Sequence, residues 1–134
     1  MRGAYGDEEL VEFAFESEAD SDLTPADLLM LARACWQFNT RMGLTGEIRL
    51  QGERFIQTIE GPCAVVQPLA ARILADPRHG LIRIDAFGRV AAKRFSTWRV
   101  SGFASAADAA CPLRTANLRS VPREAGFGLV VSSL

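Results

Sequence analysis

The chain has 134 residues, of which 49% are hydrophobic and 23% are charged. This length favours a single domain with its own core, and the composition is typical of a globular protein. The formal net charge is −1, so the chain lacks the basic footprint that nucleic-acid binding needs.

The N-terminal region predicts a strand followed by a helix. Residues 10–15 form a short apolar run with aromatic side chains, which predicts a strand, and the polar residues 16–23 predict a loop. Thr24 is then a candidate N-cap, with Pro25 at the first helical position and Asp27 as the partner of a capping box. We therefore expect the first helix to begin at this point.

Helical spacing continues through the next fifteen or so residues. The apolar face consists of Leu28, Leu31, Ala32, Cys35, Trp36 and Phe38. Asn39 lies near the end of the helix, and Gly43 is the expected stop. Residues 44–50 and 54–60 then alternate as two strands joined by a tight turn at Gly52.

A second helix and two more strands follow. Pro62 opens the helix and Asp76-Pro77 ends it. Its apolar stripe consists of Val65, Val66, Leu69, Ala70, Ile73 and Leu74. Residues 81–87 alternate as a strand, and the segment 94–103 holds a final strand that begins near Trp98.

The order of these elements is βαββαββ. It predicts an α+β, ferredoxin-like fold with a mainly antiparallel sheet and both helices on one face. We assign residues 8–104 to this domain. We expect residues 105–134 to be a C-terminal extension with a short helix and a loose tail.

The three cysteines indicate a reducing compartment. Their number is odd, and no two of Cys35, Cys63 and Cys111 have the spacing of metal ligands. This argues against a disulfide framework and against a zinc site. No segment approaches the ~20 apolar residues of a membrane span, and the charged N-terminus is no signal peptide. We expect a cytoplasmic protein that binds neither membrane nor nucleic acid.

Three polar residues have both a structural and a functional interpretation. Gln57 lies between Phe55 and Ile59 on one face of a strand, where a buried amide needs partners, although glutamine is more often exposed. Asn39 is either a helix cap or an amide that recognises a ligand edge. His79, the only histidine, is either solvated in a turn or faces a polar ligand together with Arg78.

Catalytic motifs are missing from the chain. GxSxG, Walker A, HExxH and the dinucleotide fingerprint do not occur, and nothing in the sequence shows that Glu60 and Asp76 meet. We therefore predict that the protein is not an enzyme. Fold alone does not fix function, so an enzyme on this scaffold is the least favoured hypothesis.

Four segments resemble motifs of the BLUF family, in the same order. Residues 39–46 (Asn-Thr-Arg-Met-Gly-Leu-Thr-Gly) look like its N-x-x-x-G-I-T-G, and residues 55–61 (Phe-Ile-Gln-Thr-Ile-Glu-Gly) look like its F-x-Q-x-[LI]-E-G. Residues 76–79 (Asp-Pro-Arg-His) match D-x-R-H, and residues 94–98 are similar to its R-x-F-x-x-W region with a shifted register. The resemblance covers residues 10–103.

The resemblance implies a blue-light sensor domain that binds a flavin between its two helices. FAD is the expected cofactor, with FMN or no flavin as alternatives. Carried over by motif, Asn39 would bind an edge of the ring and Gln57 would be the amide that switches its hydrogen bonds. Arg78 and His79 would lie near the ring and ribityl chain, and Trp98 would pack near the glutamine.

One residue departs from the family at its photochemical centre. The family has a tyrosine on the first strand, which gives an electron and a proton to the flavin, and Phe15 occupies that position here. Phenylalanine has no hydroxyl to bind Gln57. The resemblance therefore implies a flavin site, lined by Phe15, whose photocycle is absent or impaired. Trp98 is an alternative electron donor.

Other departures bear on the pocket. Glu47 and Arg49 replace apolar residues, and alternation alone does not decide whether they face the helices or the outside. Phe38 replaces a polar residue and its ring would fill part of the pocket. These changes keep open the alternative of a degenerate BLUF-like interaction module that binds no flavin.

The resemblance also implies partners. A chain without an output domain would signal by docking to another protein, whose identity the sequence does not give. Family members of this size often associate through the outer sheet face, so we expect a homo-oligomer. Ile48 and Ile56 are the candidate contacts.

Overall fold

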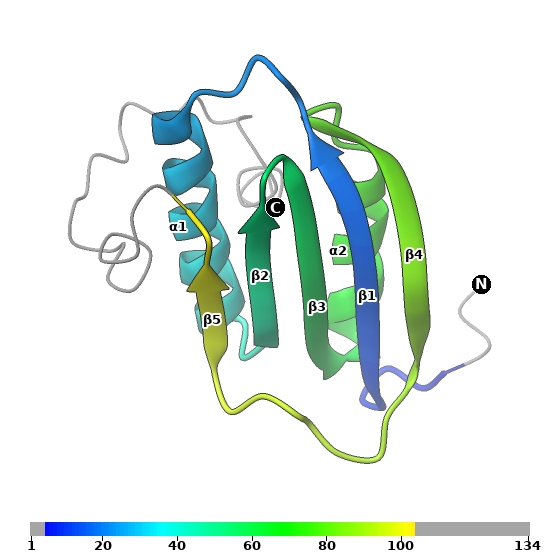
Figure 1. Cartoon of the computed structure of the whole chain (residues 1–134). Coiled ribbons are helices and arrows are strands. Elements are labelled where there is room, and N and C mark those ends of the chain that lie inside the picture. The colour runs from blue at the N-terminus through cyan, green and yellow to red at the C-terminus, as the bar shows by residue number, and fades with distance from the viewer. Residues whose placement is uncertain (1–4, 104–134) are drawn as a thin grey trace.

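The computed structural model describes residues 5–103, which form five strands and two helices (Figure 1). In chain order these are β1 (Leu10–Ala19), α1 (Pro25–Arg41), β2 (Thr45–Gln51), β3 (Arg54–Pro62), α2 (Cys63–Leu74), β4 (His79–Arg89) and β5 (Trp98–Ser101). The predicted order of elements is confirmed. The predicted extension over residues 105–134 lies outside the described residues.

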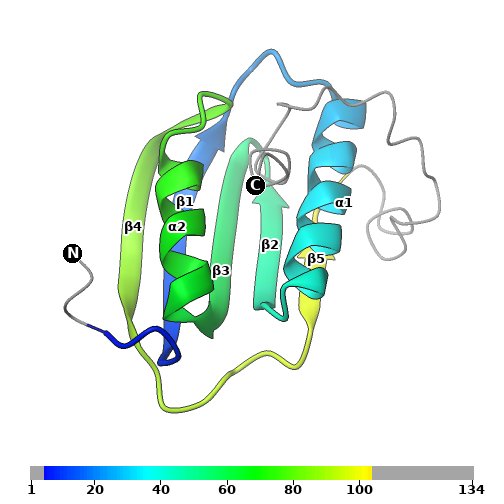
Figure 2. The ribbon, with the colours of Figure 1, turned by 180° about the vertical axis from the view of Figure 1, so that it is seen from behind.

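The strands form one sheet with the order β4-β1-β3-β2-β5. The β1–β3, β1–β4 and β2–β3 pairs are antiparallel, whereas β5 joins β2 in parallel. Both helices cover the same face, with α2 against β1 and β3 and α1 against β2 and β5 (Figure 2). This is the predicted ferredoxin-like α+β fold, with β5 added at one edge.

The core lies between the helices and the inner face of the sheet. Alternation along β1 places Val11, Phe13 and Phe15 inward, each at most 1% exposed, and Phe55 and Ile59 do the same on β3. The helices contribute Leu31, Ala32, Cys35, Phe38, Val66, Leu69, Ala70 and Ile73. Neither described helix is both long and apolar enough to cross a membrane.

The first strand is longer than its apolar run predicted. β1 continues through residues 16–19, which we expected to be a loop, and it pairs with β3 as far as Glu18 opposite Arg54. Alternation explains the error, because Glu16 and Glu18 point outward and reach Arg54 while Ser17 is buried. Likewise β4 extends two residues beyond the expected 81–87 at each end.

Both helices begin and end close to the predicted residues. The Thr24 side chain accepts a hydrogen bond from Asp27 N–H at 3.1 Å, and Thr24 N–H donates to the Asp27 carboxylate at 3.0 Å. This confirms the capping box, which contributes about 1 kcal/mol. Gly43 has φ +75°, which favours glycine after the helix, and Pro62 is the N-cap of α2.

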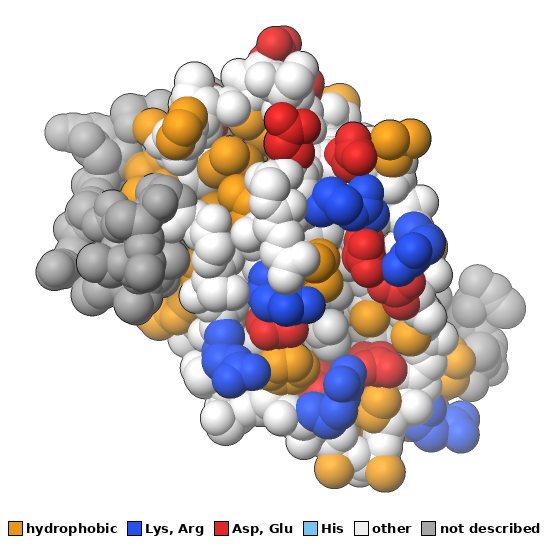
Figure 3. All heavy atoms as spheres, in the orientation of Figure 1, with side chains coloured by type: hydrophobic (Ala, Val, Ile, Leu, Met, Phe, Trp, Pro, Cys, Tyr) orange, Lys and Arg blue, Asp and Glu red, His pale blue; other side chains and the backbone are white. Residues whose placement is uncertain are grey.

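The outer face of the sheet carries interleaved charges (Figure 3). Glu47 and Arg49 lie on this face and are ion-paired at 3.5 Å, so they do not enter the core. Glu16 bridges Arg54 and Arg83, and other pairs join Glu12 to Arg94 and Glu47 to Arg99. Ile56 is half-buried on this face, whereas Ile48 is fully buried on the inner face. The expectation that Ile48 offers an outer contact was therefore wrong.

Candidate functional site

Phe15 and Gln57 lie directly opposite each other on β1 and β3. Both face the helices, and their exposed fractions are 0% and 2%. The Gln57 Nε2 atom is buried and has no hydrogen-bond partner among residues 5–103. An unsatisfied buried donor costs about 1–3 kcal/mol, so this amide is an unusual feature of an otherwise apolar inner face.

Trp98 lies over a glycine on the neighbouring strand. Its ring is 3% exposed, and its backbone pairs with Gly46 in the parallel ladder between β2 and β5. A Cβ on Gly46 would be 3.0 Å from Trp98 Cζ3 and 1.9 Å from the carbonyl oxygen of Thr58, and Gly46 has φ +142°. The missing side chain therefore gives the indole its place on the inner face. Trp98 Nε1 is also buried, and no described residue accepts a hydrogen bond from it.

Asn39 lies in the last turn of α1 and is 4% exposed. Its backbone carbonyl accepts a hydrogen bond from Leu44 N–H at 2.8 Å, which closes the turn into β2. As predicted, Asn39 lies near the end of the helix, which continues to Arg41. Its side chain is buried, and its role in recognising a ligand edge stays a prediction.

His79 is buried rather than solvated, with 6% of its surface exposed. Its Nε2 atom lies 2.7 Å from the carbonyl oxygen of Ile73, and its Nδ1 atom lies 2.7 Å from Ser17 Oγ. Since a carbonyl only accepts, Nε2 carries the proton and Nδ1 of the neutral ring accepts from the serine hydroxyl. Burial lowers the pKa of His79, while the bond to Ile73 and the charge of Asp76 raise it; burial is the larger effect.

The histidine also connects to the Phe15–Gln57 pair. The rings of His79 and Phe15 meet edge to face, with their centroids 6.2 Å apart. Phe15 stacks in turn on Phe13 at 4.8 Å. His79 therefore joins the start of β4 and the end of α2 to the inner face of β1.

The turn before β4 holds two further unsatisfied polar atoms. Asp76 is 5% exposed, and its Oδ1 accepts a hydrogen bond from Arg78 N–H at 2.9 Å. Asp76 Oδ2 and Arg78 Nη1 are both buried and have no hydrogen-bond partner in the part of the chain that the structure describes. Glu60 lies elsewhere, at the end of β3, with partners of its own, so Asp76 and Glu60 do not form a pair.

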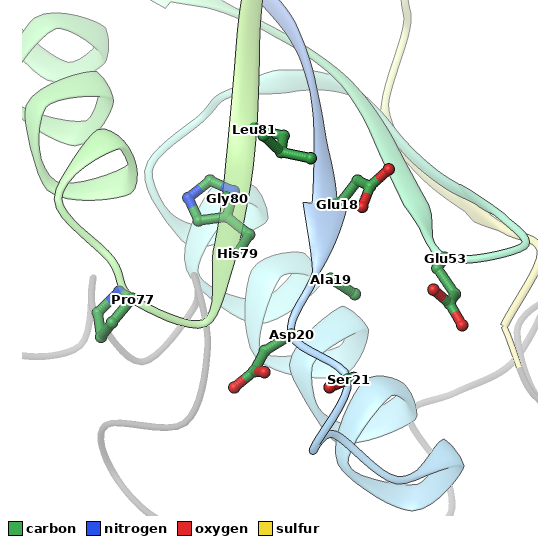
Figure 4. Close-up of a pocket in the computed structure, with 9 residues that line it drawn as sticks. All are labelled: Glu18, Ala19, Asp20, Ser21, Glu53, Pro77, His79, Gly80 and Leu81. Carbon is green, nitrogen blue, oxygen red and sulfur yellow. The ribbon is translucent and has the colours of Figure 1, made fainter.

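An open hollow lies at the far end of β1 and shares only His79 with the predicted site residues (Figure 4). Its lining includes three acidic residues, Glu18, Asp20 and Glu53, and the exposed Leu81. Carboxylates repel a phosphate group. The hollow is therefore unsuited to the phosphates of a nucleotide, and the predicted residues occupy the inner face instead.

The structure brings four of the six predicted site residues together at the inner face. Phe15 and Gln57 are paired, His79 contacts Phe15, and Trp98 lies one strand away over β2. Asn39 lies in the last turn of α1, and Arg78 lies in the turn before β4. Sequence reasoning missed Ser17, although it follows Phe13 and Phe15 at alternating positions and alternation marks it as inward.

Known proteins resemble this chain over the residues that form the sheet and its helices. The family model described as sensors of blue-light using FAD matches residues 10–101. The photoactivated adenylate cyclase subunit beta of Euglena gracilis is 34% identical over 76 residues, which are 57% of this chain and 9% of that protein. The corresponding subunit of Euglena longa is 32% identical over 76 residues, 57% of this chain and 9% of that protein.

Solved structures with the same fold include the dark state of BlrB, a BLUF protein. Its TM-score is 0.67 at 29% identity, and the match covers 96% of this chain and 100% of BlrB. Klebsiella pneumoniae BlrP1, in a calcium and cyclic-diGMP complex, has a TM-score of 0.63 at 27% identity and matches 69% of this chain and 24% of its own. With the family model matched from β1 to β5, the chain belongs to the BLUF family, the sensors of blue light using FAD.

Proposed function

We propose that this chain binds a flavin on the inner face of its sheet and signals through a protein partner, without the light cycle that depends on tyrosine. The observation that carries this proposal is the Phe15–Gln57 pair, with a buried amide donor that has no partner. The proposal rests on the family membership of residues 10–101 and on the chemistry of these side chains.

The unsatisfied atoms fit a flavin. Gln57 Nε2, Trp98 Nε1 and Arg78 Nη1 are all hydrogen-bond donors, and all are buried without an acceptor among the described residues. A flavin presents acceptor atoms along its ring edge and on its ribityl hydroxyls. A ligand of this kind would satisfy donors that otherwise destabilise the fold. Glu47 and Arg49 point outward, so two of the departures that argued against a pocket do not affect the inner face.

Each residue would have a distinct role. Gln57 would donate to a ring acceptor through Nε2, and Asn39 would bind a polar edge with its amide. Arg78 would approach the ring or ribityl chain with its guanidinium. His79 has both ring nitrogens within 2.7 Å of protein oxygen atoms, so it would act by supporting Phe15 and not by donating to the ligand.

Phe15 determines what the bound flavin can do. The aromatic ring is retained, so the wall of the site keeps its shape and apolar character. The hydroxyl that would bind Gln57 and release a proton is missing. Illumination would therefore excite the flavin without providing the Tyr–Gln hydrogen-bond exchange, and the amide would keep its dark arrangement.

The partner is proposed to dock on the outer face, which is also where we propose self-association. Ile56 is half-buried there and is surrounded by ion pairs. Such an interface would therefore have a small apolar centre and a polar rim. FAD is the proposed flavin because the family is described by it. FMN and riboflavin are the competitors to test.

Equilibrium binding tests the proposal. Purified protein, stripped of flavin by mild denaturation and refolding, is titrated with FAD, FMN and riboflavin while flavin fluorescence is followed. Saturable quenching by the wild type, weakened at least tenfold by Asn39→Ala and unchanged by the exposed Gln37→Ala, supports a specific site. No saturable binding of any flavin would overturn the proposal and leave a BLUF-like interaction module.

A further inference from the structure

The connection between the last two strands crosses the whole end of the sheet. β4 and β5 lie at opposite edges, so residues 90–97, here named the crossover segment, pass below the ends of the strands between them (Figure 1). Most side chains of this segment are exposed. A long exposed connection is mobile unless specific contacts hold it.

A buried carboxylate makes those contacts. Glu60 is 0% exposed, although alternation along β3 directs it to the outer face. Its Oε2 accepts a hydrogen bond from Arg94 N–H at 2.8 Å, and its Oε1 accepts from Phe95 N–H at 3.2 Å and from Thr45 Oγ1 at 2.8 Å. The carboxylate is thus buried because the crossover segment covers it.

The same contacts lie next to the start of β5. Two residues beyond Phe95, the carbonyl oxygen of Thr97 accepts a hydrogen bond from Gly46 N–H at 3.2 Å. Gly46 adjoins Thr45 and is the glycine over which Trp98 lies. The Glu60 carboxylate therefore binds two segments that position Trp98. These are β2 at Thr45, next to the glycine under the indole, and the crossover segment that leads into β5.

We propose that Glu60 is a positioning residue, whose carboxylate holds the crossover segment against β2 and thereby keeps Trp98 turned inward over Gly46. Every group that approaches Glu60 within hydrogen-bond distance in the described chain is a donor. Only a group that accepts with both oxygens satisfies them all. A glutamine at this position has the same shape as glutamate, but its NH₂ group would face one of these donors. We therefore expect the contact between residue 60 and the crossover segment to be lost.

Glu60 and Trp98 make these contacts in the flavin-free protein, so the effect of Glu60 on Trp98 is measured without flavin. In a Trp36→Phe background, Trp98 is the only tryptophan of the chain. We expect Glu60→Gln to shift its fluorescence emission to the red and to raise the acrylamide quenching constant severalfold. The matched control Glu12→Gln removes only the side-chain ion pair to Arg94, and we expect it to leave Trp98 as in the parent.

The amount of folded protein is measured separately by far-UV circular dichroism. A Glu60→Gln protein with native circular dichroism and unchanged emission and quenching would overturn the proposal. If that variant does not fold, hydrogen exchange in the unmodified chain decides. We expect the amides of Arg94 and Phe95 to exchange at least tenfold more slowly than the amide of Ser96, and equal rates for the three would refute the contact.

Discussion

Replacing Gln57 with leucine removes a buried amide and keeps a side chain of similar size. The unpartnered Nε2 costs about 1–3 kcal/mol. Leucine removes this cost, and the apolar setting between Phe55 and Ile59 also favours it. We therefore expect Gln57→Leu to stabilise the flavin-free protein by about 1 kcal/mol.

The assay is urea unfolding of flavin-free protein, followed by circular dichroism. The exposed Gln37→Leu serves as the matched control, and its effect should stay within about 0.5 kcal/mol. With flavin added in excess, the order should reverse, because ligand binding stabilises only the protein that keeps its binding amide. Such a reversal is expected of a residue retained for function at a cost in stability.

A destabilisation of the flavin-free Gln57→Leu protein by 1 kcal/mol or more (about the size of one net hydrogen bond) would refute the reasoning. It would mean that the amide is already satisfied within the protein, by side chains or by bound water. The inner face would then need no ligand, and the buried donors Trp98 Nε1 and Arg78 Nη1 would no longer be evidence for a flavin site.

Two other changes test the neighbours of this amide. The pKa of His79 lies below its usual 6.5, so as pH falls through 6.5 the unfolded chain takes up a proton that the folded chain refuses. We therefore expect the free energy of unfolding to fall on acidification by up to about 1.4 kcal/mol per pH unit, and we expect His79→Gln to lack this loss. Urea unfolding above and below pH 6.5 measures both proteins. An identical dependence of the unfolding free energy on pH in the two proteins would contradict the prediction. Phe15→Tyr should restore the hydroxyl opposite Gln57 at a packing cost of about 1–3 kcal/mol, partly offset by the new hydrogen bond. When this variant is loaded with flavin, we expect its flavin absorption bands to shift reversibly to the red on blue illumination. Unshifted bands would show that the missing tyrosine is not the only reason for the absence of a photocycle.

Local signals in the sequence predicted most of the fold. The capping box at Thr24, the turn at Gly52 and the proline at 62 each specify backbone geometry through their own chemistry, and the elements begin where these residues indicate. The polar end of β1 was missed because an outward-facing strand segment has the composition of a loop. Only its partners, such as Arg54, reveal it as a strand.

The site was only partly accessible from the sequence. Gln57 stood out because a polar residue interrupts an apolar face, but the usual exposure of glutamine favoured a solvent-facing side chain, and the structure buries it instead. The bonds of His79 to Ser17 and Ile73 join segments that are far apart in the chain, so no local pattern indicates them. The burial of Glu60 likewise depends on the crossover segment, which covers this side chain on the outer face, where alternation alone would leave it exposed.

The absorption spectrum of the purified protein, recorded before and after blue illumination, distinguishes a flavin site without photochemistry from both alternatives. We expect flavin bands that appear on loading with FAD and keep their position under light, because Phe15 offers neither the hydroxyl nor the proton that the switch uses. A reversible red shift in the unmodified chain would contradict the role given to Phe15. A protein that stays colourless with FAD, FMN and riboflavin would contradict the flavin site itself.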